Sequence, residues 1–284
     1  MSGSAELRAR VEELRARGFR PTKTRGQNFL CDANMLAAIV ADAGVGPGDR
    51  VLEVGVGLGF LTHALVDAGC DVTAIEIDPE LAAFADETLG GRARLVIGDA
   101  LATKNRLGHE LTEALVDEGD WHLVANLPYS ISGPLLVLLA RTPNRPKSMT
   151  VLVQRELAQR VAAPPGSKLR GALGARLELG YHTRLGRTVG AQLFWPRPRV
   201  ASALAHLERR PAPDAARLEA YDRLVGALFQ TRRKALRASL GSYLGAPARA
   251  DEVLGALGLD PRLRVEELDS ASLLGLVDAI GTAQ

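Results

Sequence analysis

Between residues 50 and 153 the chain alternates short apolar runs with longer amphipathic stretches. The apolar runs have strand length, and the stretches between them have helical spacing with turn residues at their ends. A strand–helix–strand repeat of this kind predicts a parallel sheet with helices on both faces. We expect strands at Val51–Val54, Val72–Ile75, Arg94–Ile97, His122–Ala125 and Thr150–Val153, and helices at Ala33–Ala43, Phe60–Ala68, Pro79–Leu89, Leu107–Glu118 and Pro134–Ala140.

After residue 154 the pattern changes, and from Ala215 onward every stretch is helical. The proline-containing segment Arg209–Pro213 is the best candidate for a domain boundary. We therefore expect an α/β domain over residues 1–210, with a helical and basic extension over 1–30, and an all-helical domain over 211–284. Further helices are expected at Gln154–Ala162, Leu169–Tyr181, Leu218–Phe229, Arg232–Leu244, Ala248–Leu257 and Ser270–Ile280, and further strands at Arg187–Leu193 and Val200–Leu207.

The composition excludes several classes of protein. With 46% hydrophobic residues among 284, the chain can bury a core, which excludes general disorder. Its 2 cysteines are too few for a disulfide scaffold and favour a reducing compartment, and its 5 histidines show no metal-ligand spacing. No apolar run approaches the roughly 18 residues of a membrane span, and the N-terminus lacks a signal-peptide core. We therefore expect a cytoplasmic protein without a metal.

The net charge of +2 hides a strong segregation of sign along the chain. Residues 31–120 carry 5 basic and 17 acidic side chains, a net charge of −12. Residues 121–245 carry 20 basic and 6 acidic side chains, a net charge of +14. A general excess of Arg over Lys does not explain this segregation, which indicates an anionic partner.

Three glycines, Gly55, Gly57 and Gly59, follow the first strand of the repeat just before a helix. Glycine there permits a tight turn and close approach of the backbone to a ligand. Glu76 ends the next strand, where its carboxylate can accept hydrogen bonds from both ribose hydroxyls of a nucleoside. Asp99, after the third strand, is an acceptor suited to an adenine amino group, or alternatively a helix N-cap. The pattern predicts a nucleoside cofactor: the G-x-G-x-G spacing suits S-adenosylmethionine but leaves a nicotinamide dinucleotide open.

The fourth strand of the repeat ends in Asn126-Leu127-Pro128-Tyr129. In an open parallel sheet the carboxyl ends of the strands form the ligand crevice, so this loop faces the cofactor. The Asn126 amide oxygen and the Leu127 carbonyl can both accept from the exocyclic amine of a flat base, and Tyr129 offers a stacking face. We expect catalysis by positioning rather than by acid–base chemistry, because a methyl sulfonium is already activated.

These and other motifs make the chain similar to the 16S rRNA adenine dimethyltransferases, a branch of the Rossmann-like methyltransferases. The resemblance runs from about residue 13 to residue 270 in that family's order. It implies a Rossmann-like, seven-stranded, mostly parallel sheet and a small C-terminal all-helical domain that helps to grip rRNA. The motifs are Gly26-Gln-Asn-Phe-Leu30, Glu53-Val-Gly-Val-Gly-Leu-Gly59, Glu76-Ile-Asp78, Gly98-Asp-Ala100, Asn126-Leu-Pro-Tyr129, Gln154-Arg-Glu-Leu-Ala-Gln-Arg160, Phe194-Trp-Pro-Arg-Pro-Arg-Val200 with Ser202, and Phe229-Gln-Thr-Arg-Arg-Lys234.

The resemblance implies S-adenosylmethionine as cofactor and N6,N6-dimethylation of two adjacent adenosines near the 3′ end of 16S rRNA. Phe194 is implied to stack on the target adenine opposite Tyr129, as suits a base drawn out of its stack. Asn126 would serve both the cofactor and the target amine, beside Leu127 and Pro128. The implied cofactor-binding residues are Asn28, Leu30, Gly55, Gly57, Glu76, Ile77, Asp99, Ala100 and Asn126.

Basic residues that adjoin the adenine site are expected to bind RNA phosphates. The expected partner is 16S rRNA in an immature 30S subunit, bound by a monomer. Val56, Arg170 and Ala191 depart from the family pattern, where Pro, Tyr and Pro are usual, and the last two would alter RNA contact or the order of methylation. The candidate RNA-binding residues are Lys147, Arg155, Arg160, Lys168, Arg232, Arg233 and Lys234.

Three other functions stay open at this point. A 23S rRNA adenine methyltransferase of the macrolide-resistance type shares the chemistry, although the Asn-Leu-Pro-Tyr motif favours the 16S branch. A non-catalytic ribosome-assembly or nucleic-acid-binding factor on the same fold would not need Glu76, Asp99 and Asn126 intact. A nicotinamide-dependent dehydrogenase would leave Tyr129, Phe194 and the basic half of the chain without a role.

Overall fold

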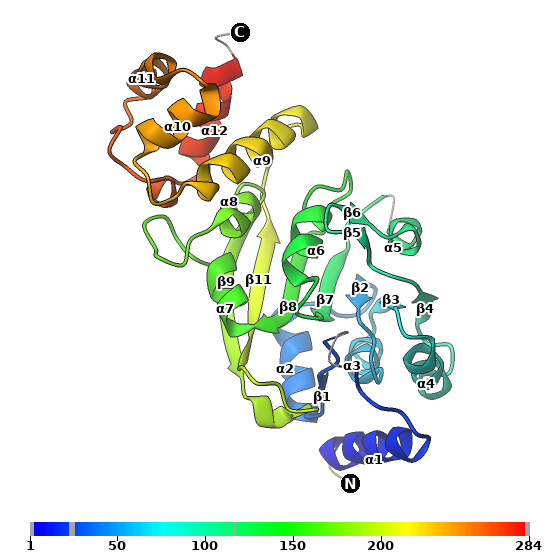
Figure 1. The fold of residues 1–284 in the computed structure, drawn as a ribbon. Coiled ribbons are helices and arrows are strands. Elements are labelled where there is room, and N and C mark those ends of the chain that lie inside the picture. Colours follow the sequence, from blue (N-terminus) through cyan, green and yellow to red (C-terminus); the bar gives the residue numbers. More distant parts are fainter. Residues whose placement is uncertain (1–2, 23–25, 116–117, 282–284) are drawn as a thin grey trace. The chain divides into compact units, whose positions relative to one another are not determined.

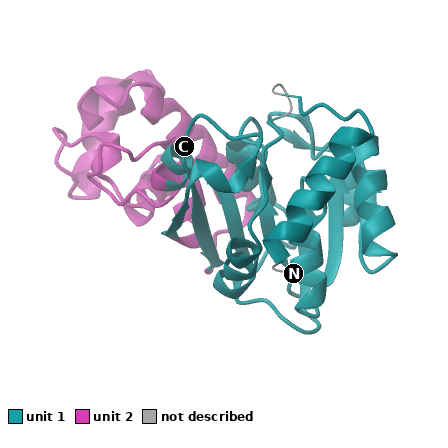
Figure 2. Ribbon diagram, turned by 90° about the horizontal axis from the view of Figure 1, so that it is seen from below, with its two compact units in different colours: residues 1–158, 184–209 teal, residues 159–183, 210–284 magenta. Residues whose placement is uncertain are grey.

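The structure, a computed structural model, describes residues 3–22, 26–115 and 118–281. It divides into two compact units (Figure 2). Unit 1 comprises residues 1–158 and 184–209, and unit 2 comprises residues 159–183 and 210–284. The chain passes from unit 1 to unit 2 between Arg209 and Arg210, near the expected domain boundary. Residues 159–183, which were expected in the α/β domain, belong to the helical unit. The reason is packing, because apolar side chains of this segment, such as Ala175 and Leu179, lie in the core of unit 2.

A seven-stranded sheet forms the centre of unit 1 (Figure 1). Its strand order is β4-β3-β2-β7-β8-β11-β9. The first five strands in this order are parallel to their neighbours, and β11 is antiparallel to β8. The predicted α/β fold with a mostly parallel seven-stranded sheet is therefore confirmed. The strands are β2 (Arg50–Val54), β3 (Asp71–Glu76), β4 (Arg94–Ile97), β7 (His122–Asn126), β8 (Ser148–Gln154), β9 (Tyr181–Val189) and β11 (Ser202–Arg209).

Helices connect the parallel strands, and local sequence sets several of their ends. Asp32 caps α2 by accepting a hydrogen bond from the Met35 N–H, and Asp78 caps α4 by accepting from the Glu80 N–H. Both helices end at a glycine with positive φ, Gly44 after α2 and Gly90 after α4. The helices that lie in unit 1 or begin there are α1 (Gly3–Ala16), α2 (Ala33–Ala43), α3 (Phe60–Asp67), α4 (Pro79–Leu89), α5 (His109–Ala114), α6 (Ser132–Leu139) and α7 (Arg155–Val161).

The strand order changes direction beside β2, and this switch positions the ligand crevice. From β2 the chain moves to β3 and β4 on one side, and later to β7 and β8 on the other side. Right-handed crossovers in opposite directions place their helices on opposite faces of the sheet. The loops that follow β2 and β7 therefore part at the carboxyl edge, where open α/β sheets bind their ligands.

The structure differs from the prediction at several elements. A two-stranded ribbon pairs β1 (Phe29–Leu30) with β10 (Phe194–Trp195), and a hairpin pairs β5 (Leu101–Thr103) with β6 (Arg106–Leu107). Because β6 occupies Leu107, α5 begins later than expected; the predicted end of this helix falls partly on residues 116–117, outside the described residues. The strand expected at 187–193 has other bounds: β9 spans Tyr181–Val189, so only residues 187–189 of the expected range lie in a strand, and a 3₁₀ turn follows at Ala191–Leu193.

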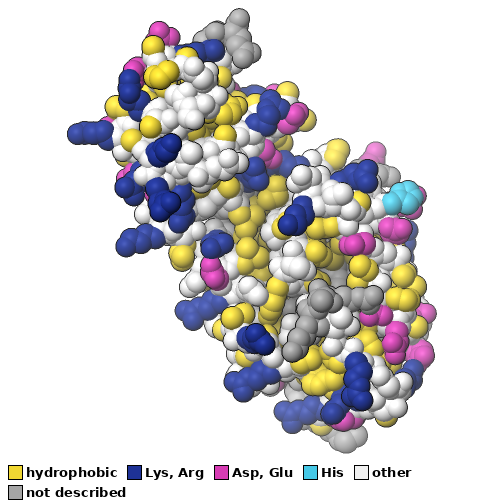
Figure 3. Space-filling view, in the orientation of Figure 1, with side chains coloured by type: hydrophobic (Ala, Val, Ile, Leu, Met, Phe, Trp, Pro, Cys, Tyr) yellow, Lys and Arg dark blue, Asp and Glu magenta, His cyan; other side chains and the backbone are white. Residues whose placement is uncertain are grey.

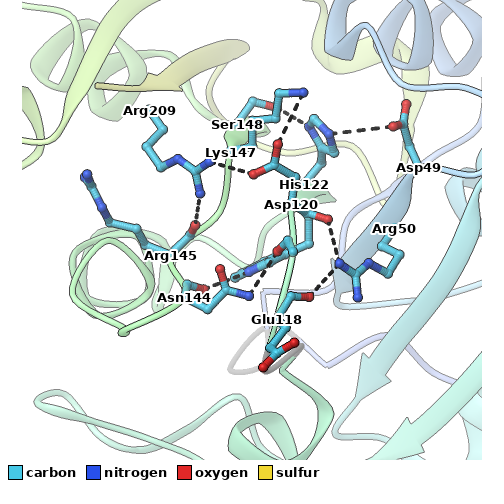
Figure 4. Close-up of polar contacts among 12 residues, drawn as sticks. Asp49, Arg50, Glu118, Asp120, His122, Asn144, Arg145, Lys147, Ser148 and Arg209 are labelled. Carbon is cyan, nitrogen blue, oxygen red and sulfur yellow. Dashed lines mark hydrogen bonds and ion pairs between the residues drawn. The ribbon is translucent and has the colours of Figure 1, made fainter. Parts of the chain in front are cut away.

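The amino edge of the sheet carries a dense polar cluster (Figure 4). Asp120 accepts a hydrogen bond from Arg209 at 2.6 Å and lies 3.6 Å from the Lys147 ammonium. Arg50 donates to the backbone carbonyls of Glu118 and Asp120 at 2.6 and 3.3 Å. His122 bonds to Ser148 at 2.7 Å. These contacts join the starts of β2, β7 and β8 to the end of β11.

Unit 2 is built from helices around a separate apolar core, which contains Tyr221, Leu224, Leu240 and Leu273. Arg170 is 1% exposed and donates to the carbonyls of Ala163 and Leu268 and to the Glu178 carboxylate. Arg170 is therefore not placed to contact RNA directly, because its guanidinium is buried among these acceptors of unit 2. The helices are α8 (Ala172–Glu178), α9 (Ala215–Gln230), α10 (Leu236–Leu244), α11 (Pro247–Ala256) and α12 (Ser270–Gly281).

Charge is segregated on the surface of unit 1 as well as along the chain. In the space-filling view, acidic side chains gather over α4 and α5, and basic side chains line the margin formed by β9 (Figure 3). Across residues 3–22, 26–115 and 118–281 no helix combines the length and apolarity needed to cross a bilayer.

Candidate active site

A cavity of about 230 Å³ opens at the carboxyl edge of the sheet in unit 1. Its walls come from the segment before β1 and from the loops that follow β2, β3, β4 and β7. All of the implied cofactor-binding residues, together with Leu127, Pro128 and Tyr129, line this one cavity. The structure thus brings together residues that are up to a hundred positions apart in the sequence.

The glycine turn forms the floor of the cavity. Gly55 and Gly57 have φ of 85° and 56°, a conformation that side chains with a Cβ rarely adopt. A Cβ on Gly57 would lie 2.7 Å from the Phe29 ring, and one on Gly55 would lie 3.3 Å from Pro128. The two glycines therefore let the turn pass beneath the β1 segment and the Asn126 loop.

Glu76 ends β3 at the cavity wall, with both carboxylate oxygens held by backbone donors. Its Oε2 accepts from the Gly57 N–H at 2.9 Å and its Oε1 from the Asp78 N–H at 3.0 Å. Burial raises its pKa, although these two hydrogen bonds oppose the shift. Each oxygen keeps a further lone pair for a ligand. The side chain is thus oriented before any ribose binds.

Glu53, on β2, is a lining residue to which the sequence analysis assigned no role. It is 1% exposed, and its Oε2 accepts a hydrogen bond from the Thr62 hydroxyl at 2.6 Å. Burial raises its pKa to about 8, and the nearby Glu76 carboxylate adds to the shift. The one available signal was an ionisable residue within an otherwise apolar strand.

Two neighbouring loops complete the cofactor side of the cavity. Ile77 follows Glu76 and is 46% exposed, so it presents an apolar face next to the carboxylate. Asp99 follows β4 and accepts a hydrogen bond from the Leu101 N–H at 2.9 Å through Oδ1, which leaves Oδ2 available. Ala100 is buried beside it. An apolar surface between two carboxylates matches the face and edge of an adenosine.

The Asn126 side chain is oriented by the segment before β1. Its Nδ2 donates to the Asn28 carbonyl at 2.9 Å, and the Asn28 Nδ2 in turn donates to the Gly26 carbonyl at 3.1 Å. This hydrogen bond fixes which end of the amide faces Asn28, and the Asn126 Oδ1 at the other end can accept a hydrogen bond from a ligand.

The rest of the loop is held rigidly. Leu127 is 1% exposed, and its N–H donates to the Leu152 carbonyl of β8 at 3.1 Å. The Ser132 hydroxyl donates to the Pro128 carbonyl at 2.9 Å. The Tyr129 hydroxyl bonds to Ser202 of β11 at 2.8 Å, and burial raises the Tyr129 pKa. Tyr129 is thus a neutral, anchored aromatic side chain at the cavity wall.

Phe194 lies outside this arrangement. It is on β10, opposite Leu30 of β1, and is 6% exposed within the apolar core of unit 1. Phe194 is not one of the described residues that line the cavity. Its neighbour Trp195 stacks on Phe29 with ring centroids 5.7 Å apart. Stacking of Phe194 on a target base stays a prediction.

The candidate RNA-binding residues fall at separate places. Lys147 pairs with Asp120 at the amino edge of the sheet, far from the cavity loops, whereas Arg155 is exposed at the end of β8, on the cavity side. The other five, Arg160, Lys168, Arg232, Arg233 and Lys234, are exposed residues of unit 2.

Comparison with known proteins is consistent with this geometry. A family model described as "Ribosomal RNA adenine dimethylase" matches residues 18–281. The chain is 43% identical to "Ribosomal RNA small subunit methyltransferase A" of Nocardia farcinica, over 96% of this chain and 94% of that protein. It is 39% identical to the protein of the same name in Corynebacterium efficiens, over 99% of this chain and 96% of that protein.

Solved structures share the fold. A dimethyladenosine transferase from Plasmodium falciparum matches with a TM-score of 0.73 at 22% identity, over 88% of this chain and 96% of that one. The 23S rRNA methyltransferase ErmE matches with a TM-score of 0.66 at 27% identity, over 89% of this chain and 99% of that one. The Rossmann-like architecture is therefore shared with both of these solved structures.

Proposed function

The chain belongs to the ribosomal RNA adenine dimethylase family, and from that premise we propose that it uses S-adenosylmethionine to dimethylate the N6 amino groups of two adjacent adenosines near the 3′ end of 16S rRNA. The observation that carries the proposal is the orientation of Asn126. Its amide nitrogen donates to the Asn28 carbonyl, which fixes the orientation of the amide and leaves its oxygen available for an exocyclic amine.

The residues of the cavity fit the proposed cofactor. Glu76 supplies a carboxylate held by two backbone N–H groups, suited to a ribose diol, and Asp99 and Ile77 supply an acceptor and an apolar face suited to adenine. The Gly55 and Gly57 turn brings backbone groups to the cavity floor. When bound, S-adenosylmethionine supplies a methyl group already activated by its sulfonium.

The protein's own contribution is positioning. The Asn126 Oδ1 and the Leu127 carbonyl accept hydrogen bonds from the target amine and so direct the nitrogen lone pair toward the cofactor side of the cavity. Tyr129, held by Ser202, stacks on the flat base. Phe194 covers the other face of the base once it becomes accessible. The orientation of the amine and the exclusion of water replace acid–base catalysis.

Two alternatives are less well supported. The relatives with about 40% identity are named for the small subunit, whereas the 23S rRNA enzyme ErmE is 27% identical. A non-catalytic assembly factor would have no need for the hydrogen-bonded Asn126, Glu76 and Asp99 geometry. We also propose a cytoplasmic monomer that acts on an immature 30S subunit, with Arg160, Lys168, Arg232, Arg233 and Lys234 of unit 2 on rRNA phosphates.

Transfer of a labelled methyl group to 30S subunits that lack the modification tests the proposal, with free 16S rRNA and 50S subunits as parallel substrates. We expect transfer to the 30S subunit, and primer-extension stops at two adjacent adenosines near the 3′ end. Transfer to 23S rRNA alone would identify a macrolide-resistance enzyme. Binding of S-adenosylmethionine without transfer to any of the three substrates would contradict catalysis.

A further inference from the structure

The β5–β6 hairpin is a basic element within the most acidic part of the chain. Its residues 102–106 are exposed, and Lys104 and Arg106 form no ion pair with any part of the chain that the structure describes. Two of the other three arginines in this acidic stretch are bonded to acceptors. Arg50 and Arg92 bond to neighbouring acceptors, and Arg94 lies at the start of β4.

The hairpin is joined to the active site at both of its ends. It begins directly after Asp99 and Ala100, which line the cavity, and the Gly108 N–H donates to the Ala100 carbonyl at 2.9 Å to close its base. Its second strand, β6, packs against α6, the helix that follows the Asn126 loop. Two unpaired cations are therefore held beside the cavity wall by a short, anchored hairpin.

A second group of unpaired cations lies on the other side of the Asn126 loop. Arg197 and Arg199 are exposed in the segment between β10 and β11, and Arg155 is exposed at the end of β8. The Arg155 N–H donates to the Ala201 carbonyl at 3.0 Å, next to the Ser202 that anchors Tyr129. None of these three guanidinium groups forms an ion pair within residues 3–22, 26–115 and 118–281.

The strand order separates the two groups. The hairpin follows β4, on one side of β7, whereas Arg155 and Arg199 belong to the β8 and β11 side. Neighbouring strands are about 4.8 Å apart, so β4 lies about 14 Å from β7, and β11 about 10 Å from it in the opposite direction. The loop that presents Asn126 therefore lies between two sets of free positive charges.

We propose that the β5–β6 hairpin is an RNA-binding element, in which Lys104 and Arg106 bind backbone phosphates on one side of the target adenosine while Arg197 and Arg199 bind phosphates on the other. The inference rests on the proposed function, since it assumes that the target base enters this cavity. Gripping the strand on both sides holds a flipped nucleotide, because the flanking backbone is then fixed while the base leaves the stack.

Salt dependence distinguishes phosphate contacts from an indirect effect. Each neutralised phosphate adds about 0.7 (single-stranded) to 0.9 (duplex) to the slope of log affinity against log salt concentration. The double variant Lys104→Ala/Arg106→Ala should therefore bind an rRNA fragment that contains the target with a slope smaller by about 1.4 to 1.8. Arg197→Ala/Arg199→Ala should reduce it by a similar amount.

Arg94→Ala is the matched control, because Arg94 is an exposed, unpaired arginine on the strand that leads to the hairpin, at the opposite edge of the sheet. It should leave the slope and the methyl transfer unchanged. S-adenosylmethionine affinity, measured by calorimetry, should stay at the wild-type value in all three variants. Lys104→Arg/Arg106→Lys, which keeps both charges, should restore the wild-type slope.

An unchanged salt slope for the hairpin variant, with wild-type methyl transfer, would overturn the inference and leave the proposed function intact. The same slope change in the Arg94→Ala control would also overturn the inference, since loss of any positive charge on the protein would then have the same effect as loss of the hairpin charges. If the wild-type protein itself transfers no methyl group to any rRNA, the proposed function fails, and the hairpin result is read from RNA binding alone.

Discussion

At the amino edge of the sheet, Asp120, Arg209 and Lys147 are charged side chains bonded to one another, whereas Glu76 and Lys104 near the carboxyl edge are bonded to backbone or left without an ion pair in the described chain. At the amino edge, Asp120 contacts both Arg209 and Lys147 (Figure 4). At the carboxyl edge, Glu76 is held only by N–H groups, and Lys104 lies exposed without an ion pair in the described chain.

This difference separates stability from function. A cluster whose charges are already paired offers little to a ligand, and it ties together strands that start far apart in the sequence. On the function proposed above, an edge with oriented acceptors and free cations gains its partners when cofactor and RNA bind. The following predictions use one edge as the control for the other.

Asn126→Ala should have the largest effect on activity. Loss of the oriented amide oxygen should lower turnover by about 10²- to 10³-fold, by analogy with removal of one preorganised hydrogen-bonding group. The matched control is Asn144→Ala at the amino edge, where the amide donates to the Gly119 carbonyl at 3.0 Å. Methyl transfer to 30S subunits and circular dichroism measure activity and folding. Normal dimethylation by Asn126→Ala would refute its assigned role.

Gly57→Ala should impair both the fold and the cofactor site. The added Cβ would lie 2.7 Å from the Phe29 ring at a φ of 56°, so we expect a loss of about 2–4 kcal/mol in the free energy of unfolding and a loss of cofactor binding. Gly44→Ala has a similar φ, 64°, but open space around it, so it should cost only about 1 kcal/mol. Denaturant titration compares them, and equal costs would contradict the packing argument.

Glu53→Gln should change how stability depends on pH. The Glu53 pKa is raised from 4.5 to about 8 in the folded protein, so the folded state holds a proton that the unfolded state releases. This contribution is present in full below pH 4.5 and is lost as the pH rises to about 8. The free energy of unfolding of the wild type minus that of Glu53→Gln, measured by denaturant titration, should therefore fall as the pH rises across this window. The histidines are common to both proteins and cancel. A flat difference would show that Glu53 is ionised in the fold.

Asp120→Ala should have the smallest effect, because its ion pairs are partly exposed. We expect a loss of under about 1 kcal/mol in the free energy of unfolding and unchanged methyl transfer. The hydrogen bond from Arg209 lowers the Asp120 pKa, so this contribution is present above the ordinary carboxyl pKa and is lost as the pH falls through the folded value. Thermal melts at neutral and acidic pH measure this contribution to stability. A large loss of activity would contradict the assignment of stability to the amino edge and function to the carboxyl edge.

The sheet could be predicted from the sequence because its signals are local. All five strands of the repeat form within two residues of their expected bounds. Four of them are largely buried, and the less buried β4 pairs with β3 at the edge of the sheet. The glycines, Glu76 and Asn126 could be predicted as site residues for the same reason, because each lies at the end of a strand or shortly after it. The hairpin at 101–107 was missed because its strands are short and exposed and carry no apolar alternation.

Contacts between distant segments were decided by tertiary structure alone. Three examples are the pairing of Phe29 with Trp195, the hydrogen bond from Asn126 to Asn28 and the burial of Arg170. In each case the local sequence around one residue does not indicate which distant segment it will contact. The sequence by itself determined where the strands lie along the chain and which polar and glycine residues stand at their ends, and these residues carry the cofactor that we propose. Only packing determined which cations stay without an ion pair in the described chain, because an ion pair forms only where folding brings an opposite charge within about 4 Å.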